Sequence, residues 1–422
     1  MALEYRNNEL YCEDVPLTEL HEEFGTPLYV YSRTKLLENF QALDAALSGI
    51  DHVTCFALKA NSNVQLLKVL AEHGAGADVV SGGELLLARK AGFPPERMVF
   101  AGVGKREDEL EFGLKEDIFC FNVESVQELQ LISRVALRLQ KTARVALRIN
   151  PDINAESHPY ISTALKEHKF GIPAGESREA FRVAASLPNL EVCGVHVHLG
   201  SQIVRKEPYT AAATFLSTLV RELRGAGISI AHVDIGGGFG VRYKNVLRHE
   251  GLPEEQDDQE SIPSPAQFID TMLPVLRETG CRIWLEPGRA VIADAGLLLT
   301  QVLYRKENRS KRFLIVDAGM NDLLRPSLYN AYHQIVPVRI ETYEHEKTDI
   351  VGPVCETGDF FARDRQMPKT KQRDLLAILT TGAYGFVNAS NYNSRLRPAE
   401  VLVNGDRVRV IRPRQTMNEL AQ

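Results

Sequence analysis

The chain has 422 residues, of which 44% are hydrophobic and 25% are charged, and its formal net charge is −6 at pH 7. This composition is typical of a globular protein, and the length predicts two domains, or one large barrel with an accessory domain. The acidic balance gives no electrostatic reason to expect nucleic acid or an anionic membrane as a partner, so we expect chemistry on a small molecule.

Two features of the sequence bear on where the protein works. The six cysteines are scattered and include no C-x-x-C pair, which favours a reducing cytoplasm over a secreted disulfide framework. The start, "MALEYRNNELYCEDVP", has neither the basic region nor the apolar run of an export signal. No later stretch is apolar for long enough to cross a membrane. We therefore expect a cytoplasmic protein that is neither exported nor anchored.

Residues 1–35 contain two strand-like stretches, "LEYRNNELYCEDVP" and "TPLYVYS", ahead of the first βα unit. We expect these N-terminal strands to join a β domain rather than the barrel that follows them.

From residue 53 onward, short β-branched runs alternate with helical patterns, which is typical of βα units and a parallel sheet. The helical patterns include "NVQLLKVLAEHG", "GGELLLARKAG" and "PYTAAATFLSTLVRELRGAG". Eight strands are predicted: "VTCFAL", "ADVV", "MVFAG", "IFCFN", "ARVALRIN", "EVCGVHVHL", "AHVDI" and "RIWLE". Eight units over this length favour a closed (β/α)8 TIM-like barrel, at about residues 36–290, over an open doubly wound sheet.

After residue 290 the pattern changes to strand-like stretches with no long amphipathic helix between them. This predicts a second, all-β domain over residues 291–422. Its predicted strands are "AGLLLTQVLYRK", "KRFLIVDAG", "HQIVPVRI", "DLLAILTTG" and "DRVRVIRP". One further segment, residues 241–265, is polar, acidic and rich in turn residues, so we expect a surface loop there and assign it no role.

The polar residues that close the barrel strands are the first candidates for function, because barrels of this class build their active sites at the C-terminal ends of the strands. Lys59 closes the first predicted strand. A solvated lysine is the simpler interpretation of an isolated residue of this kind. Held in an apolar pocket, however, a lysine loses its proton more readily and becomes a candidate Schiff-base nucleophile.

The sixth strand, "GVHVHLGSQ", places His196 and His198 on one face, because successive strand residues alternate between faces. Two histidines at this spacing could begin a metal site, but no carboxylate or cysteine nearby in the sequence completes a ligand set, so we predict no metal. His198 lies nearer the strand end and could stack on a flat ring or make a hydrogen bond. His196 is expected to be a satisfied packing residue.

The seventh strand ends in "DIGGGFG", where Gly236, Gly237 and Gly238 let the backbone turn tightly and expose consecutive N–H groups to a phosphate. The alternative is an ordinary flexible turn. The spacing fits neither a P-loop nor the Rossmann fingerprint, which requires glycine where Val241 stands. The position after strand seven is nevertheless where such barrels often hold a phosphate.

The eighth strand, "RIWLEPGR", ends in Glu286, with Arg289 just beyond it. The two residues could form a structural ion pair, or the carboxylate could meet a basic nitrogen of a ligand while the guanidinium binds a carboxylate. A lysine, a ring neighbour, a phosphate loop and a carboxylate would then share one end of the barrel. Pyridoxal 5'-phosphate (PLP) requires such a set, because it carries an aldehyde, a flat ring, a phosphate and a pyridine nitrogen.

With these motifs and with "RPSLYNAYH", "GPVCETGD" and "GAYGF", the chain resembles the alanine-racemase-type PLP enzymes, and within them the diaminopimelate decarboxylases, over nearly its whole length. The resemblance implies PLP as cofactor and decarboxylation of meso-2,6-diaminopimelate to L-lysine and carbon dioxide, the final step of lysine biosynthesis. It also implies a homodimer in which the Cys355 and Glu356 segment of one subunit reaches the barrel of the other.

The resemblance further implies roles for individual residues. Lys59 would bind the PLP aldehyde, and Cys355 would donate the proton that replaces the lost carboxylate. The cofactor would be held by Lys59, Asp78, His198, Ser201, Gly236, Gly237, Gly238, Glu286, Gly288, Arg289 and Tyr384. The substrate would be held by Arg289, Arg325, Tyr329, Glu356 and Tyr384. His198 would stack on the cofactor ring, and Glu286 would keep the pyridine nitrogen protonated.

Simpler interpretations stand beside three of these roles. Asp78 could cap the helix that begins at "SGGE". Arg325 could be a surface arginine before a proline. A cysteine in a strand-rich domain is usually buried and inert, but the polar neighbours of Cys355 argue against burial.

Other functions on the same fold remain alternatives. A decarboxylase of ornithine, arginine or carboxynorspermidine acts on a substrate without the distal carboxylate for which Arg289, Arg325 and Tyr329 are expected. A racemase of this fold favours arginine where Glu286 stands. A non-catalytic PLP-binding protein would resemble the barrel alone, and a lysine-dependent aldolase would lack PLP.

Overall fold

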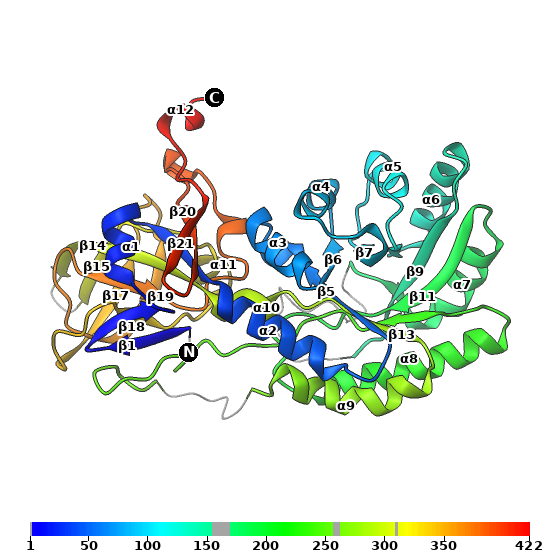
Figure 1. Ribbon diagram of the computed structural model, residues 1–422, viewed down its shortest axis with the longest axis horizontal. Helices are drawn as coiled ribbons and strands as arrows, with labels where there is room; N and C mark the ends of the chain where they lie inside the picture. The colour runs from blue at the N-terminus through cyan, green and yellow to red at the C-terminus, as the bar shows by residue number, and fades with distance from the viewer. Residues whose placement is uncertain (1, 154–168, 256–261, 309–310) are drawn as a thin grey trace. The chain divides into compact units, whose positions relative to one another are not determined.

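A computed structural model describes residues 2–153, 169–255, 262–308 and 311–422. The chain forms two compact units (Figure 1). The first, here called the β unit, comprises Met1–Asn39, Val241–Ser261 and Val291–Gln422, and the second, the barrel unit, comprises Phe40–Gly240 and Ile262–Ala290. The segment after Gly240, which interrupts the barrel pattern in the sequence, therefore belongs to the β unit.

The barrel unit is built on eight parallel strands that close on themselves. Their order is β9-β11-β12-β13-β5-β6-β7-β8, and β8 pairs with β9 to complete the ring. Their bounds are β5 (His52–Ala57), β6 (Gly76–Val79), β7 (Met98–Phe100), β8 (Cys120–Val123), β9 (Ala143–Asn150), β11 (Leu190–His196), β12 (His232–Asp234) and β13 (Arg282–Leu285). A short additional strand, β10 (Ile172–Pro173), pairs with β9. The eight strands match the eight predicted ones, which confirms the closed (β/α)8 barrel.

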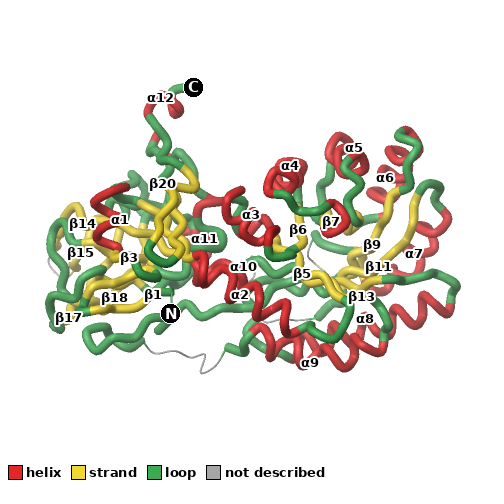
Figure 2. Tube along the Cα trace, in the orientation of Figure 1, coloured by secondary structure: helices red, strands yellow, loops and turns green. Residues whose placement is uncertain are grey.

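Helices surround these strands on the outside (Figure 2). They are α2 (Arg33–Ala46), α3 (Val64–Glu72), α4 (Gly82–Ala91), α5 (Glu107–Lys115), α6 (Val126–Arg138), α7 (Ser177–Ser186), α8 (Glu207–Gly225) and α9 (Pro265–Glu278). Several begin at a residue whose side chain accepts a backbone hydrogen bond, as Ser81 does for α4 and Ser125 for α6. Such caps satisfy the free N–H groups of the first turn, and therefore fix where each helix starts after its strand.

The interior of the barrel is filled with apolar side chains rather than open. Its cluster comprises Val53, Cys55, Val99, Cys120, Ala146, Cys193 and Trp284. The ring of Phe119 stacks on Trp284 with 4.2 Å between centroids. The polar side chains described below stand at the other end of the strands, where each strand runs into its following loop.

The β unit contains a nine-stranded sheet in the order β18-β17-β15-β14-β4-β20-β21, in which β19 also pairs with β14 and β16 pairs with β19. The bounds are β4 (Leu28–Ser32), β14 (Gly296–Asn308), β15 (Lys311–Val316), β16 (Ile335–Pro337), β17 (His345–Val351), β18 (Phe360–Pro368), β19 (Leu375–Ile378), β20 (Ala399–Asn404) and β21 (Arg407–Arg412). Strand β4, from the N-terminal "TPLYVYS", pairs with both β14 and β20. A β-sheet domain therefore accompanies the barrel, as predicted.

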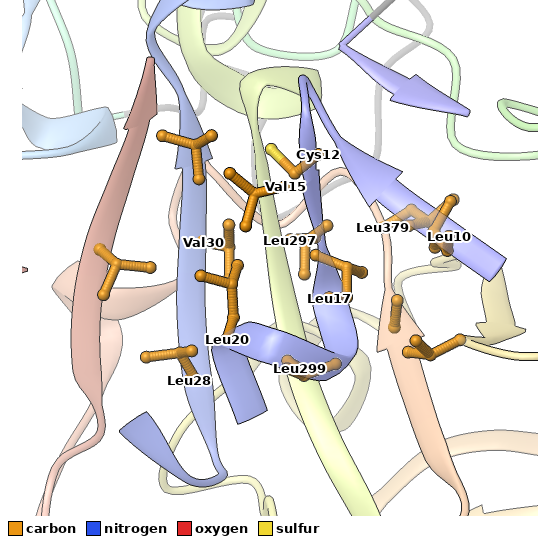
Figure 3. Packing of buried hydrophobic residues seen from close by; sticks show 14 of the residues in the cluster. Leu10, Cys12, Val15, Leu17, Leu20, Leu28, Val30, Leu297, Leu299 and Leu379 are labelled. Carbon is orange, nitrogen blue, oxygen red and sulfur yellow. The ribbon is translucent and has the colours of Figure 1, made fainter. Parts of the chain in front are cut away.

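A smaller sheet of β1 (Leu3–Arg6), β2 (Glu9–Cys12) and β3 (Val15–Pro16) leads into α1 (Leu17–Phe24), and apolar side chains from both pack against the large sheet (Figure 3). The cluster includes Leu10, Val15, Leu20, Val30 and Leu297, all buried. Each such side chain contributes about 1.5–3 kcal/mol on burial. The chain also forms the short helices α10 (Arg289–Ile292), α11 (Arg325–Tyr329) and α12 (Met417–Leu420). Among the described residues, no helix has both the length and the apolar character that a membrane crossing requires.

Candidate active site

Lys59 stands directly after the first barrel strand, in the short turn Leu58–Ala60. Its side chain is 33% exposed, and its ammonium nitrogen Nζ donates to Oδ2 of Asp78 at 3.1 Å. The pairing of β5 with β6 places Asp78 beside Ala57, two residues before the lysine. The strand register therefore brings the only acid of β6 to the amine.

Asp78 is fully buried, which makes its ionised form costly. Burial raises the pKa of this carboxyl to about 6, the nearby Glu286 adds to the rise, and Lys59 opposes it. Oδ1 of Asp78 is buried and accepts no hydrogen bond from the described residues. A helix cap does not explain this side chain, because Ser81 and not Asp78 caps α4.

Glu286 follows β13 and lies in a buried polar cluster. Its Oε1 accepts from Nδ2 of Asn122 at 2.9 Å, and its Oε2 lies 3.3 Å from Nε2 of His196. Burial opposes ionisation of Glu286, but His196, Lys59 and a hydrogen bond with Asp234 outweigh it and hold the pKa well below its ordinary value. The carboxylate is therefore ionised although it is buried.

His196 and His198 lie beside a carboxylate that the sequence around them does not show. His196 is buried, and its Nε2 faces the carboxylate of Glu286 rather than apolar side chains alone. Glu286 also supplies, in space, the carboxylate that the sequence around the two histidines lacks, since ligand atoms of all three residues lie within 4.8 Å of one another. The sequence around the two histidines does not show this carboxylate, because Glu286 follows a different strand, β13.

His198 contacts the glycine loop that follows β12. Its Nδ1 accepts from the N–H of Gly237 at 3.3 Å. Burial, together with the charges of Lys59 and Arg148, lowers the pKa of His198 well below its ordinary value. The ring is therefore neutral, which suits it to stacking on a flat ligand.

The glycine loop is too closely packed for side chains. A Cβ on Gly237 would lie 2.2 Å from the backbone oxygen of Glu286, and one on Gly238 would lie 2.3 Å from the backbone oxygen of Gly200. Gly236 and Gly238 also have positive φ angles of 66° and 93°. The three glycines are thus required by backbone conformation or close approach, which excludes an ordinary flexible turn.

Arg289 and Ser201 are the other two predicted polar site residues in the barrel unit. Arg289 begins α10, is 5% exposed and donates from Nη2 to Oγ of Ser201 at 3.0 Å. Gly288 precedes it, and a Cβ there would lie 2.9 Å from Cβ of Ala60. This close approach places the end of the eighth strand against the residue that follows Lys59.

The β unit carries the remaining predicted residues. Arg325 begins α11 and is buried, which excludes a surface role, and Tyr329 ends the same helix. Cys355 is an exposed free thiol, and its backbone N–H donates to Oδ1 of Asn393 at 2.7 Å. Glu356 is exposed beside it. Tyr384 has a positive φ of 57°, which is uncommon for a tyrosine and often marks a functional position.

Two residues of the cluster escaped sequence reasoning. Asp234 is the last residue of β12, and Asn122 is the third residue of β8, and both side chains are buried at Glu286. The signal that identified Glu286, a polar residue at the end of a barrel strand, applies equally to both.

Comparison with known proteins indicates the same cofactor, PLP, that the geometry of the barrel end suits. A family model described as "Pyridoxal-dependent decarboxylase, pyridoxal binding domain" matches residues 33–293. A diaminopimelate decarboxylase of Aquifex aeolicus is 48% identical over 422 residues, which cover 100% of this chain and 96% of the relative. One from Pseudomonas aeruginosa is 47% identical and covers 99% and 97%. This chain belongs to the diaminopimelate decarboxylase family.

A solved member of the diaminopimelate decarboxylase family has the same fold. The Helicobacter pylori diaminopimelate decarboxylase, in complex with L-lysine, superposes with a TM-score of 0.89 at 42% identity, covering 96% of this chain and 98% of that one. The predictions of family, enzyme class and cofactor are therefore confirmed.

The residues of the barrel unit fit the PLP of diaminopimelate decarboxylases. An amine stands beside a buried acid with one oxygen unbonded among the described residues, and a neutral imidazole lies beside a loop with no room for side chains. The ionised Glu286 suits a protonated pyridine nitrogen. Each chemical part of the cofactor thus has a matching group at the same end of the barrel.

Proposed function

We propose that this chain removes the carboxylate from the D centre of meso-2,6-diaminopimelate and releases L-lysine and carbon dioxide, the final step of lysine biosynthesis. The observation that carries this proposal is the pairing of Lys59 with the buried Asp78 beside an ionised, buried Glu286. The full-length similarity to curated diaminopimelate decarboxylases supports the substrate.

PLP, when bound, supplies an electron sink for the electron pair that the departing carboxylate leaves behind. Lys59 would hold the cofactor through its aldehyde, and Glu286 would hold a proton on the pyridine nitrogen. His198 would cover one face of the ring. Ser201, Arg289 and the loop Gly236, Gly237 and Gly238 would hold the phosphate, where backbone N–H groups are natural donors.

The substrate would be oriented at its far end. Arg289, Arg325 and Tyr329 would bind the distal carboxylate, since a guanidinium fork matches a carboxylate in two hydrogen bonds. Glu356 would bind the amino group at the reacting end, and Tyr384 would contact substrate and phosphate. Cys355 would donate the proton to the reacting carbon. Fixing the distal carboxylate uses binding energy remote from the chemistry to orient the bond that breaks.

We also propose a homodimer with shared active sites. Cys355 and Glu356 are exposed, as residues that serve a neighbouring subunit would be in one isolated chain. A cytoplasmic location is part of the proposal, and the six free thiols support it, since thiols persist in a reducing compartment.

The test is to incubate the purified protein with PLP and meso-diaminopimelate, with ornithine in a parallel reaction, and to measure carbon dioxide and lysine. We expect lysine and carbon dioxide in equal amounts from diaminopimelate and little product from ornithine. Product from ornithine alone would overturn the substrate assignment, and the absence of both products would overturn the proposed activity.

A further inference from the structure

Arg325 is held by a histidine eight residues further along the chain. Its Nη1 and Nε2 of His333 are 2.8 Å apart, and Nδ1 of His333 is 2.8 Å from the backbone oxygen of Leu379. Because a carbonyl only accepts, the histidine carries its hydrogen on Nδ1 and leaves a lone pair on Nε2. The guanidinium therefore donates to a neutral imidazole.

The chain path explains how the two side chains meet. Helix α11 ends after one turn at Tyr329, and Asn330 takes the left-handed conformation with φ at 52°, so the chain reverses after it. His333 is completely buried. Its backbone oxygen also accepts from Nη1 of Arg365 on β18 at 2.9 Å. The imidazole is thus held by the backbone of Leu379, and the backbone of His333 is held by Arg365.

The segment after Gly240, to which the sequence assigned no role, adds an aromatic ring to this pair. The ring of Tyr243 meets His333 edge-on at 5.2 Å, and the guanidinium carbon of Arg325 lies 4.8 Å from the centre of that ring. A guanidinium over an aromatic face is attracted by the ring quadrupole. Tyr243 therefore restrains the plane of the guanidinium, while His333 restrains one of its edges.

The same segment is fastened beside His333 by a reciprocal pair of hydrogen bonds. Nε2 of Gln334 donates to the backbone oxygen of Leu247 at 2.8 Å, and the N–H of Leu247 donates to Oε1 of Gln334 at 2.9 Å. A side chain that mimics a strand partner in this way fixes the segment in register. Tyr243 is accordingly part of a built structure and not of a loose loop.

We propose that His333 and Tyr243 are positioning residues that fix the guanidinium of Arg325 for the distal carboxylate of the substrate. They thereby set the preference for a substrate with a carboxylate at both ends over one that lacks the far carboxylate. This inference rests on the proposed function, in which Arg325 binds that carboxylate. A guanidinium that is held in place before binding loses less conformational entropy when its two hydrogen bonds to the carboxylate form. Its affinity for the carboxylate is therefore higher without any additional contact.

The experiment compares His333→Leu, which removes the acceptor, with His333→Gln, whose amide oxygen can accept from Arg325. In the PLP-loaded enzyme we expect His333→Leu to raise the KM for meso-diaminopimelate about tenfold or more with a smaller change in kcat, and His333→Gln to recover most of the loss. Tyr243→Leu should raise KM in the same way, whereas Tyr243→Phe, which keeps the ring, should stay within about twofold of wild type.

D-Lysine serves as the probe that separates positioning from general damage, because it has the same reacting end and no distal carboxylate. Its binding, followed by the visible absorbance of the cofactor, should change less than about threefold in every variant. Equal weakening for both ligands would overturn the inference, as would an unchanged KM in both His333→Leu and Tyr243→Leu. If His333→Leu does not fold, the same comparison of KM for diaminopimelate with D-lysine binding is made on Tyr243→Leu, with His333→Gln beside it. A wild-type enzyme without turnover of diaminopimelate would overturn the proposed function and this inference with it.

Discussion

Asp234 and Glu286, at the ends of neighbouring strands β12 and β13, are buried carboxyl groups joined by a hydrogen bond, and their pKa values move in opposite directions. Burial and the charge of Glu286 raise the pKa of Asp234 well above its ordinary value, whereas the pKa of Glu286 is lowered. Two carboxylates in contact cannot both ionise. Asp234 therefore stays protonated, and its hydroxyl donates a hydrogen bond to Glu286. The negative charge of the pair then lies on Glu286, where the pyridine nitrogen would need it.

This division of roles predicts unequal effects of two similar substitutions. Glu286→Gln removes the charge and should lower kcat about a hundredfold, the size expected for a lost electrostatic partner. Asp234→Asn keeps a neutral donor in the same place and should cost less than about tenfold. Steady-state kinetics on PLP-saturated enzyme checks both. Equal losses would contradict the assignment of the charge to Glu286.

Lys59 is the proposed attachment point of the cofactor. Lys59→Ala should abolish the visible absorbance of the bound cofactor and reduce decarboxylation below detection, because it removes the amine that would bind the aldehyde. The matched control is Lys68→Ala, at an exposed position on α3, which should leave both unchanged. Turnover of Lys59→Ala at the wild-type rate would rule the assignment out.

Gly237 tests the phosphate loop. Gly237→Ala would place a Cβ 2.2 Å from the backbone oxygen of Glu286, so the loop must shift and PLP affinity should fall about tenfold or more. A Cβ on Gly104 meets nothing within 4 Å, and Gly104→Ala should bind PLP like the wild type. Equilibrium dialysis measures both affinities. Indistinguishable values for the two variants would show that the loop does not hold the cofactor.

Cys355 is exposed, whereas Cys12, Cys55, Cys120, Cys193 and Cys281 are buried. In the native protein a disulfide-exchange reagent should therefore leave those five thiols unmodified, so that any thiol labelled rapidly is Cys355 and none is labelled in Cys355→Ser, since access controls the reaction. If Cys355 is the proton donor, Cys355→Ser should also lower kcat about a hundredfold, the loss typical of a missing general acid. Rapid labelling of several thiols would contradict the burial of the others, and an unchanged kcat would contradict the catalytic role.

Asp322 gives a pH dependence of stability that is separate from the cofactor site. It is 1% exposed, and burial raises the pKa of its carboxyl from 3.8 to about 7. The folded state binds this proton more tightly than the unfolded state. The stability that the proton provides is therefore fully present below about pH 4 and is lost as the pH rises to about 7.

The loss of stability from Asp322 amounts to at most about 4 kcal/mol, because each tenfold difference in proton affinity between the folded and unfolded states corresponds to about 1.4 kcal/mol. Asp322→Asn should remove that part of the decline, so its melting temperature should exceed the wild-type value at pH 8 by more than at pH 4. Asp270→Asn, at an exposed position of α9, is the control and should leave the profile unchanged. Parallel profiles for Asp322→Asn and the wild type would show that the carboxyl is not the source.

The sequence was enough to find Lys59, the glycine loop and Glu286, because each stands where a barrel strand ends and strand ends share one side of a parallel barrel. It was not enough to show which of these groups bond to one another. The contact of Glu286 with Asn122 depends on the closure of the ring, and the strand order is visible only in the fold.

In the C-terminal part of the β unit, after residue 290, the sequence revealed five strands but not β17, β18 or β20. The pattern of β18, "FFARDRQMP", carries four charged residues or amides among its apolar ones, so local hydrophobicity gave no clear signal. The role of Tyr243 was equally hidden, because it depends on contacts with Arg325 and His333 more than eighty positions away.

Strand β4 ends at Ser32, yet its neighbours in the sheet begin at Gly296 and Ala399. During synthesis, one edge of this earliest strand of the large sheet therefore stays unpaired until β14 has been made, and the other until almost the whole chain has left the ribosome. The barrel unit ends at Ala290 and has all its strands long before that moment. The order of events that follows is a barrel first and the β unit last, with its N-terminal segment exposed to other strands for the longest time.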